Sequence, residues 1–112
     1  MAATRLNLWL PVVFWAGVIF TLSAIPSLGT GFGAWDLVLR KLAHVAEYAV
    51  LGAFLYRALR REPAAVLLGS AYAVTDEVHQ AFVRGRQGSP VDWLIDTAGV
   101  LAGTVLFARW SR

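Results

Sequence analysis

Four hydrophobic segments of roughly membrane-spanning length follow one another along the chain. The first, 6–25, contains no charged residue and ends before Pro26. The other three, 37–59, 63–83 and 91–110, are apolar except for short groups of polar residues. A helix needs about 20 largely apolar residues to cross a bilayer. The pattern therefore predicts an all-α polytopic membrane protein, a single domain over 1–112 folded as an antiparallel bundle of four transmembrane helices.

The stretches between these segments read as loops. Pro63 and Pro90 stand where helices tolerate proline, because a first-turn N–H has no partner within the helix. The stretches 26–33 and 84–90 are rich in residues that favour turns. The first segment also resembles a secretory signal peptide, with Arg5 before its apolar core and small residues near its end. A cleaved leader followed by three helices is therefore the alternative to four spans.

The composition supports a membrane protein. Of the 112 residues, 58% are hydrophobic and 15% are charged, whereas soluble domains are about 45–50% apolar and about 25% charged. Cysteine is absent, which excludes disulfides, thiolate zinc sites and cysteine nucleophiles. In a membrane protein, a net charge of +3 marks loop orientation and contact with lipid headgroups rather than nucleic acid. We therefore expect membrane lipids as partners and no nucleic acid.

The basic residues predict the orientation of the bundle. With four spans, both termini lie on one side of the membrane, together with Arg5, Arg57, Arg60, Arg61, Arg109 and Arg112. The opposite side carries Arg40, Lys41, Arg84 and Arg86. Cytoplasmic loops of membrane proteins carry an excess of Lys and Arg. The six-to-four distribution predicts that the N- and C-termini are cytoplasmic.

This orientation gathers the ionisable residues of three helices in the extracytoplasmic half of the membrane. The polar residues in this half are Lys41, His44, Glu47 and Tyr48 in the second segment, Asp76, Glu77, His79 and Gln80 in the third, and Asp92 and Asp96 in the fourth, with Arg84 and Arg86 in the adjoining turn. Spacings of three and four place each set on a helix face. Asp92 and Asp96 share their face with a GxxxG motif at Gly99 and Gly103, which permits close helix approach. Ionisable residues inside a membrane usually face the bundle interior and carry function.

The order and spacing of these residues resemble the VanZ-like family. The resemblance covers nearly the whole chain and rests on Lys41-x-x-His44-x-x-Glu47-Tyr48, Asp76-Glu77-x-His79-Gln80 and Asp92-x-x-x-Asp96-x-x-Gly99-x-x-x-Gly103. Two positions depart from the pattern, since the family often has Pro where this chain has Arg84 and Asn where it has Asp96. The resemblance implies a small multi-helix protein of the bacterial cytoplasmic membrane, linked through the founding member to resistance to the glycopeptide teicoplanin. The resemblance therefore implies a function in the cell envelope but does not indicate which reaction, if any, is catalysed.

The polar residues favour binding of an anionic lipid or a lipid-linked envelope precursor. Lys41, Arg84 and Arg86 are the expected headgroup ligands, because cationic side chains make charge-assisted hydrogen bonds to phosphate. Glu47, Tyr48, His79, Gln80, Asp92 and Asp96 are the further candidate binding residues. A purely structural role, in which the cluster only locks the fold, is a third reading beside binding and catalysis.

Catalysis is the main alternative. A carboxylate beside a histidine can act as a general base, so His44, Glu77 and Asp76 are the candidate catalytic residues of a lipid-linked hydrolase or transferase. Asp76-x-x-His79 facing His44-x-x-Glu47 resembles bundle metal sites, but the nearby Lys41 and arginines would repel a cation. We therefore predict neither a bound metal nor a cofactor.

Asp76 and Glu77 are adjacent and project about 100° apart on a helix. We therefore expect only one of them in the pocket. The prediction is that Glu77, with His44 and Arg86, lines an outward-opening polar pocket, and that Asp76 pairs toward the fourth helix or His79.

Overall fold

Four helices make up the part of the chain that the computed structural model describes, residues 5–23, 34–82 and 90–111. They are α1 (Arg5–Ser23), α2 (Ala34–Leu59), α3 (Glu62–Ala81) and α4 (Pro90–Trp110), and no strand occurs within these ranges. The expectation of an all-α chain with four helices is confirmed for this part. The helices begin slightly earlier than the hydrophobic segments, because helix ends extend into polar residues that the hydropathy pattern does not include.

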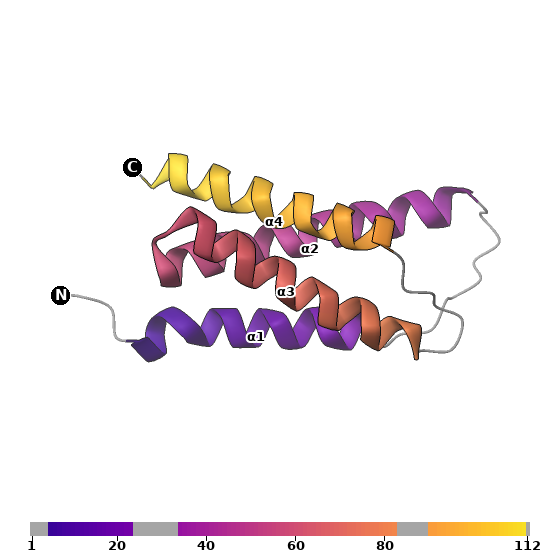
Figure 1. Cartoon of the computed structure of the whole chain (residues 1–112), viewed down its shortest axis with the longest axis horizontal. Helices are drawn as coiled ribbons and strands as arrows, with labels where there is room; N and C mark the ends of the chain where they lie inside the picture. Colours follow the sequence, from indigo (N-terminus) through magenta and orange to yellow (C-terminus); the bar gives the residue numbers. More distant parts are fainter. Residues whose placement is uncertain (1–4, 24–33, 83–89, 112) are drawn as a thin grey trace.

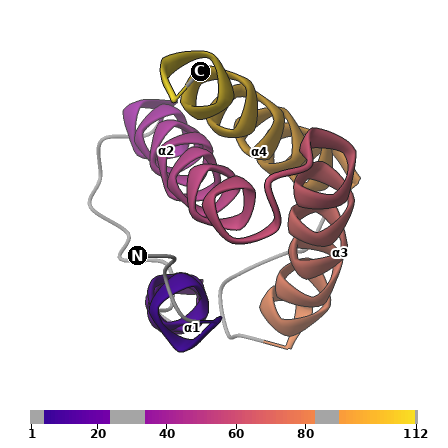
Figure 2. The same ribbon diagram turned by 90° about the vertical axis from the view of Figure 1, so that its left-hand side faces the viewer.

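Successive helices run in opposite directions along an elongated bundle of 51 × 24 × 21 Å (Figure 1). The start of α1, the junction of α2 with α3 and the end of α4 lie at one end of the bundle (Figure 1). The view along the bundle shows α4 beside both α2 and α3, with α1 set apart from α4 (Figure 2). The most extensive contact is between α2 and α4, which are far apart in the sequence.

Glycines explain why α2 and α4 approach so closely. A Cβ atom added at Gly99 would lie 2.7 Å from the carbonyl oxygen of Val45, and one added at Gly103 would overlap the Ala49 backbone. The backbone of Gly52 on α2 faces α4 in the same way, and its carbonyl oxygen accepts a hydrogen bond of 3.2 Å from Thr104 Oγ1. The GxxxG face therefore points into the bundle, as the sequence indicates.

The junction between α2 and α3 is tight. Arg60 adopts a left-handed backbone conformation with φ 57°, the geometry with which many helices end. Its N–H donates a hydrogen bond of 2.7 Å to the carbonyl oxygen of Tyr56. Its guanidinium group lies over the Tyr56 ring, 5.2 Å from the ring centre. The two helices consequently pack antiparallel with almost no connecting loop.

The bundle buries polar side chains and exposes large apolar ones. Asp76, Glu77, Asp96 and Thr104 are buried. Large apolar residues on every helix are exposed, among them Phe14, Leu42, Leu67, Val78 and Leu106. Two helices, α1 over Arg5–Leu22 and α4 over Val91–Trp110, are long and apolar enough to cross a membrane by length and composition. Because signal sequences and core helices of soluble proteins meet the same criterion, these two helices alone are weak support for a membrane protein.

Candidate functional site

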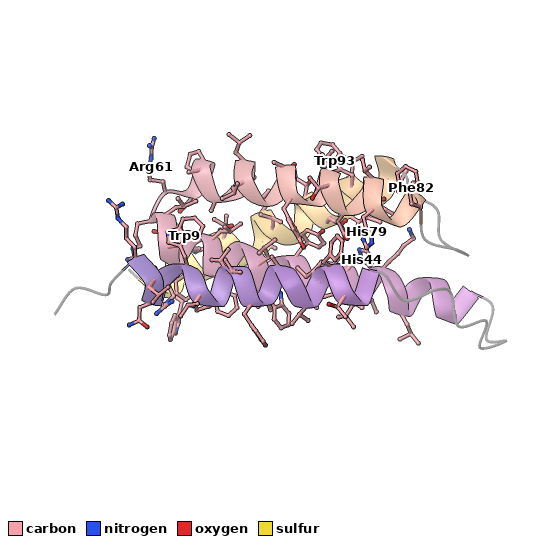
Figure 3. All side chains as sticks on the ribbon, turned by 90° about the horizontal axis from the view of Figure 1, so that it is seen from below. Trp9, His44, Arg61, His79, Phe82 and Trp93 are labelled. Atoms are coloured by element: carbon pink, nitrogen blue, oxygen red, sulfur yellow. The ribbon has the colours of Figure 1, made fainter. Side chains whose placement is uncertain are left out.

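A cluster of hydrogen-bonded polar side chains lies at the end of the bundle opposite the α2–α3 junction. We define this polar cluster as Lys41, His44 and Tyr48 of α2, Asp76 and Glu77 of α3, and Asp92 and Asp96 of α4. Figure 3 shows His44 at this end, with His79 and Trp93 nearby and Arg61 and Trp9 at the other end. The expected convergence of ionisable residues from three helices is therefore present in the described part of the chain.

Lys41 and Asp92 form the outermost pair of the cluster. Lys41 Nζ donates a hydrogen bond of 2.7 Å to Asp92 Oδ1. The two side chains are 37% and 27% exposed, so this ion pair is accessible from the end of the bundle. We call it the open end of the polar cluster.

His44 and Asp96 form the next pair inward. His44 Nδ1 lies 2.9 Å from Asp96 Oδ1. The Asp96 side chain is completely buried, whereas that of His44 is 14% exposed. A carboxylate held against one ring nitrogen of a histidine fixes the orientation and the tautomer of the imidazole.

Tyr48 and Asp76 form the innermost pair. The Tyr48 hydroxyl donates a hydrogen bond of 2.8 Å to Asp76 Oδ2, and both side chains are buried. The rings of Tyr48 and His44 are stacked with their centres 6.4 Å apart, which connects this pair to the one above it. The three pairs therefore follow one another from the accessible end into the core.

Helix periodicity produces this order. The three residues of α2 recur at spacings of three and four, and Asp92 and Asp96 of α4 are four residues apart. Such spacings place side chains one turn apart on the same helix face. The helices α2 and α4 run parallel to each other and antiparallel to α3. Successive residues on the facing sides of α2 and α4 therefore pair in order from the open end inward, and the innermost of them, Tyr48, contacts Asp76 of α3.

Carboxyl groups outnumber cations in the cluster. The Glu77 carboxyl group is buried as well. Asp76 Oδ1 and Asp96 Oδ2 are buried and accept no hydrogen bond. One nitrogen of His44 and one oxygen from each of Asp76 and Asp96 lie within 4.8 Å of one another. These three residues are the described side chains that can hold a metal ion.

Two further predicted site residues, His79 of α3 and Glu47 of α2, make contacts with α1. The His79 ring stacks on Phe20 of α1 with their centres 3.9 Å apart, and His79 is not in the group that contains His44. Glu47 is half-buried on α2, where its backbone carbonyl accepts a hydrogen bond of 2.8 Å from Trp15. Of the four residues in the alternative metal arrangement, Asp76 and His44 come together, and the third ligand-type residue beside them is Asp96 of α4. Gln80, Arg84 and Arg86 have side chains outside the described residues.

The Asp76 carboxyl group lies near α4, in the direction that the sequence analysis expects. It is within 4.8 Å of ligand-type atoms of His44 and Asp96, and it accepts the hydrogen bond from Tyr48 of α2. Glu77 is buried as well. The expected pocket of Glu77, His44 and Arg86 stays a prediction, because Arg86 lies outside the described residues.

Helix α1 contributes more than the sequence suggests. Its Phe20 ring stacks on His79, and its Trp15 donates a hydrogen bond to α2. In addition, the carbonyl oxygen of Ala16 accepts a hydrogen bond from the Tyr72 hydroxyl of α3. The Tyr72 ring in turn lies 6.3 Å from that of Tyr48. The aromatic residues of an otherwise apolar run give no sequence signal for such contacts.

The fold and the site together define a small all-helical protein with a buried, acidic polar cluster open at one end. A family model described as VanZ/LLP1 matches residues 2–111. The chain belongs to this family, as the sequence resemblance indicates. Membership suggests a protein associated with glycopeptide resistance and, with the two apolar helices, weakly suggests a membrane protein. No curated protein and no solved structure matches the chain.

Proposed function

We propose that the protein is a multi-pass membrane protein that binds a lipid with an anionic headgroup, or a lipid-linked envelope precursor, at the open end of its polar cluster. In this proposal all four helices span the bacterial cytoplasmic membrane, the termini are cytoplasmic and the open end faces outward. Acids are buried, whereas Phe14, Leu67 and Leu106 on three different helices are 67–74% exposed. Such a distribution suits a hydrocarbon environment, because extended apolar surfaces are rare on soluble monomers.

Burial also explains why α2 and α3 look too polar to span a membrane. Among their ionisable residues, Asp76 and Glu77 are buried and the His44 side chain is 14% exposed, so these groups face the inside of the bundle. Charged groups in membranes are tolerated when they face the interior and pair with one another. Mean hydropathy counts these residues without regard to the direction in which they point.

The observation that carries the proposal is the Lys41–Asp92 ion pair at the open end. Its partial exposure makes the ammonium group available to an arriving phosphate, which can replace or share the Asp92 carboxylate as the hydrogen-bond acceptor. Asp92 lies at the start of α4 and Lys41 in the first half of α2. If both helices span the membrane, the pair is at the depth of the lipid headgroups. The hydrogen-bonding groups further inside the bundle, beginning with His44, can then bind the other polar atoms of the headgroup.

Native mass spectrometry of the purified full chain tests the proposal. We expect anionic phospholipid or polyprenyl phosphate to remain bound, and Lys41→Gln to reduce its occupancy about tenfold, as the loss of one charge-assisted hydrogen bond predicts. Arg109→Gln is the matched control, because Arg109 is an exposed cation at the other end of α4. Equal loss of lipid from both variants, or no bound anionic lipid, contradicts the proposal.

The His44–Asp96 pair favours a second candidate, an enzyme that acts on a lipid-linked phosphate or ester. A histidine held by a buried carboxylate is suited to general-base catalysis, and Asp76 has a carboxylate oxygen within 4.8 Å of both members of the pair. The same mass spectra distinguish the two functions. A binding protein carries the same lipid species after His44→Gln, whereas an enzyme accumulates a different, unprocessed species in that variant.

A further inference from the structure

Three side chains that are metal ligands in many proteins converge from three helices inside the bundle. They are His44 of α2, Asp76 of α3 and Asp96 of α4, and one ligand-type atom of each lies within 4.8 Å of the other two. Both aspartates are at least 99% buried. The arrangement differs from an exposed acidic patch, because each ligand is held by a separate helix.

Two buried carboxylate oxygens in this group have no hydrogen-bond donor. Asp76 Oδ1 and Asp96 Oδ2 are inaccessible to water, and within the described part of the chain nothing donates to either. The other oxygens of the same two groups are satisfied, Asp76 Oδ2 by Tyr48 and Asp96 Oδ1 by His44. Burying a charged oxygen without a partner costs several kcal/mol as an order of magnitude, so this arrangement calls for a positive charge at this place.

We propose that His44, Asp76 and Asp96 bind a divalent transition-metal ion, with Zn²⁺ as the representative ion. One imidazole nitrogen and two carboxylate oxygens are suitable ligands for such ions, and a charge of +2 balances the two carboxylates. The His44 Nδ1–Asp96 Oδ1 separation is 2.9 Å. It has to widen by only a few tenths of an ångström, to about 3.4 Å, for both atoms to bind one tetrahedral ion at about 2.0–2.2 Å.

The surroundings of the three residues are compatible with this ion. The Tyr48 hydroxyl orients the Asp76 carboxylate, as hydrogen bonds to ligands commonly do around metal sites. Lys41 is already neutralised by its 2.7 Å ion pair with Asp92, so its charge is less repulsive than the sequence suggests. The partly exposed edge of His44 offers access.

The proposal goes beyond lipid binding and does not depend on it. The measurement is isothermal titration of Zn²⁺ into the metal-depleted, tag-free full chain in detergent, with the bound ion counted by elemental analysis after dialysis. We expect about one Zn²⁺ per chain, as for a single closed site. Less than about a tenth of an equivalent in the unmodified chain overturns the proposal, whatever happens to the variants, and leaves a shared proton as the charge that balances the cluster.

The variants Asp76→Asn and Asp96→Asn locate the ion, because they keep the shape of the side chain and remove its charge. Each is expected to weaken Zn²⁺ binding at least about tenfold, as expected for loss of a ligand or its orienting partner. The control is Glu62→Gln, which removes a carboxylate of α3 at the opposite end of the bundle and should leave Zn²⁺ binding unchanged. Tight Zn²⁺ binding that survives in the Asp76→Asn, Asp96→Asn double variant also overturns the assignment. Mg²⁺ in place of Zn²⁺ should bind far more weakly, because imidazole is a poor ligand for it.

Discussion

The two halves of the α2–α4 interface are held together by different interactions. In the half toward the α2–α3 junction, Gly52 and Gly103 bring the backbones into contact, and Leu55 lies in the adjoining hydrophobic core. In the other half Gly99 packs against Val45, and the polar contacts are the Lys41–Asp92 and His44–Asp96 pairs, of which the first is the more exposed. The first half is close-packed and apolar, and the second is polar and contains carboxylate oxygens without donors.

This difference indicates separate tasks for the two halves. Close packing stabilises a bundle at little electrostatic cost, because no charge is buried. Buried carboxylates lower stability unless a cation or a proton balances them. We infer that the glycine half sets the positions of α2 and α4, and that the polar half uses those positions to hold a ligand.

The largest effect is expected from Gly103→Leu. A side chain at Gly103 would overlap the Ala49 backbone, and backbone cannot move aside as a flexible side chain can. We expect a loss of more than about 3 kcal/mol in the free energy of unfolding, above the usual range for overpacking. Denaturation followed by circular dichroism in detergent measures it. Gly17→Ala is the control, since a Cβ atom there meets nothing within 4 Å. Equal destabilisation by both variants would contradict the role given to the glycine half.

A smaller effect is expected from Tyr48→Phe in the polar half. The substitution removes the hydroxyl that donates to Asp76 Oδ2 and leaves another buried carboxylate oxygen without a donor. Such a loss costs about 1–3 kcal/mol. Tyr56→Phe, on the same helix in the apolar half, provides the comparison and should change stability less. A Tyr48→Phe protein as stable as the parent would show that this hydrogen bond contributes nothing to the fold.

Helix periodicity made much of the site predictable from the sequence. Lys41, His44 and Tyr48 fall on one face of α2, as Asp92 and Asp96 do on α4, and such spacing determines the face without any knowledge of the fold. The GxxxG motif correctly indicated which face of α4 points inward.

The pairing between helices was less predictable. It depends on the rotation and axial shift of one helix against another, and the Gly103–Ala49 backbone contact fixes these only after folding. Asp76, rather than Glu77 or His79, consequently meets His44 in the structure. The contacts of Trp15 and Phe20 on α1 were likewise invisible in an uninterrupted apolar run.

The stability of the Asp76→Asn, Asp96→Asn double variant in the absence of metal tests the division of tasks most directly. Asparagine retains an oxygen that can accept the hydrogen bonds from Tyr48 and His44, while two buried charges disappear. If the polar half exists to hold a ligand, the double variant unfolds at the same or a higher temperature than the metal-depleted parent, as often happens when charge is removed from a functional site. A melting temperature lower by more than about 5 °C, roughly 1 kcal/mol for a chain of this size, would contradict the account and show that the polar cluster holds the fold together.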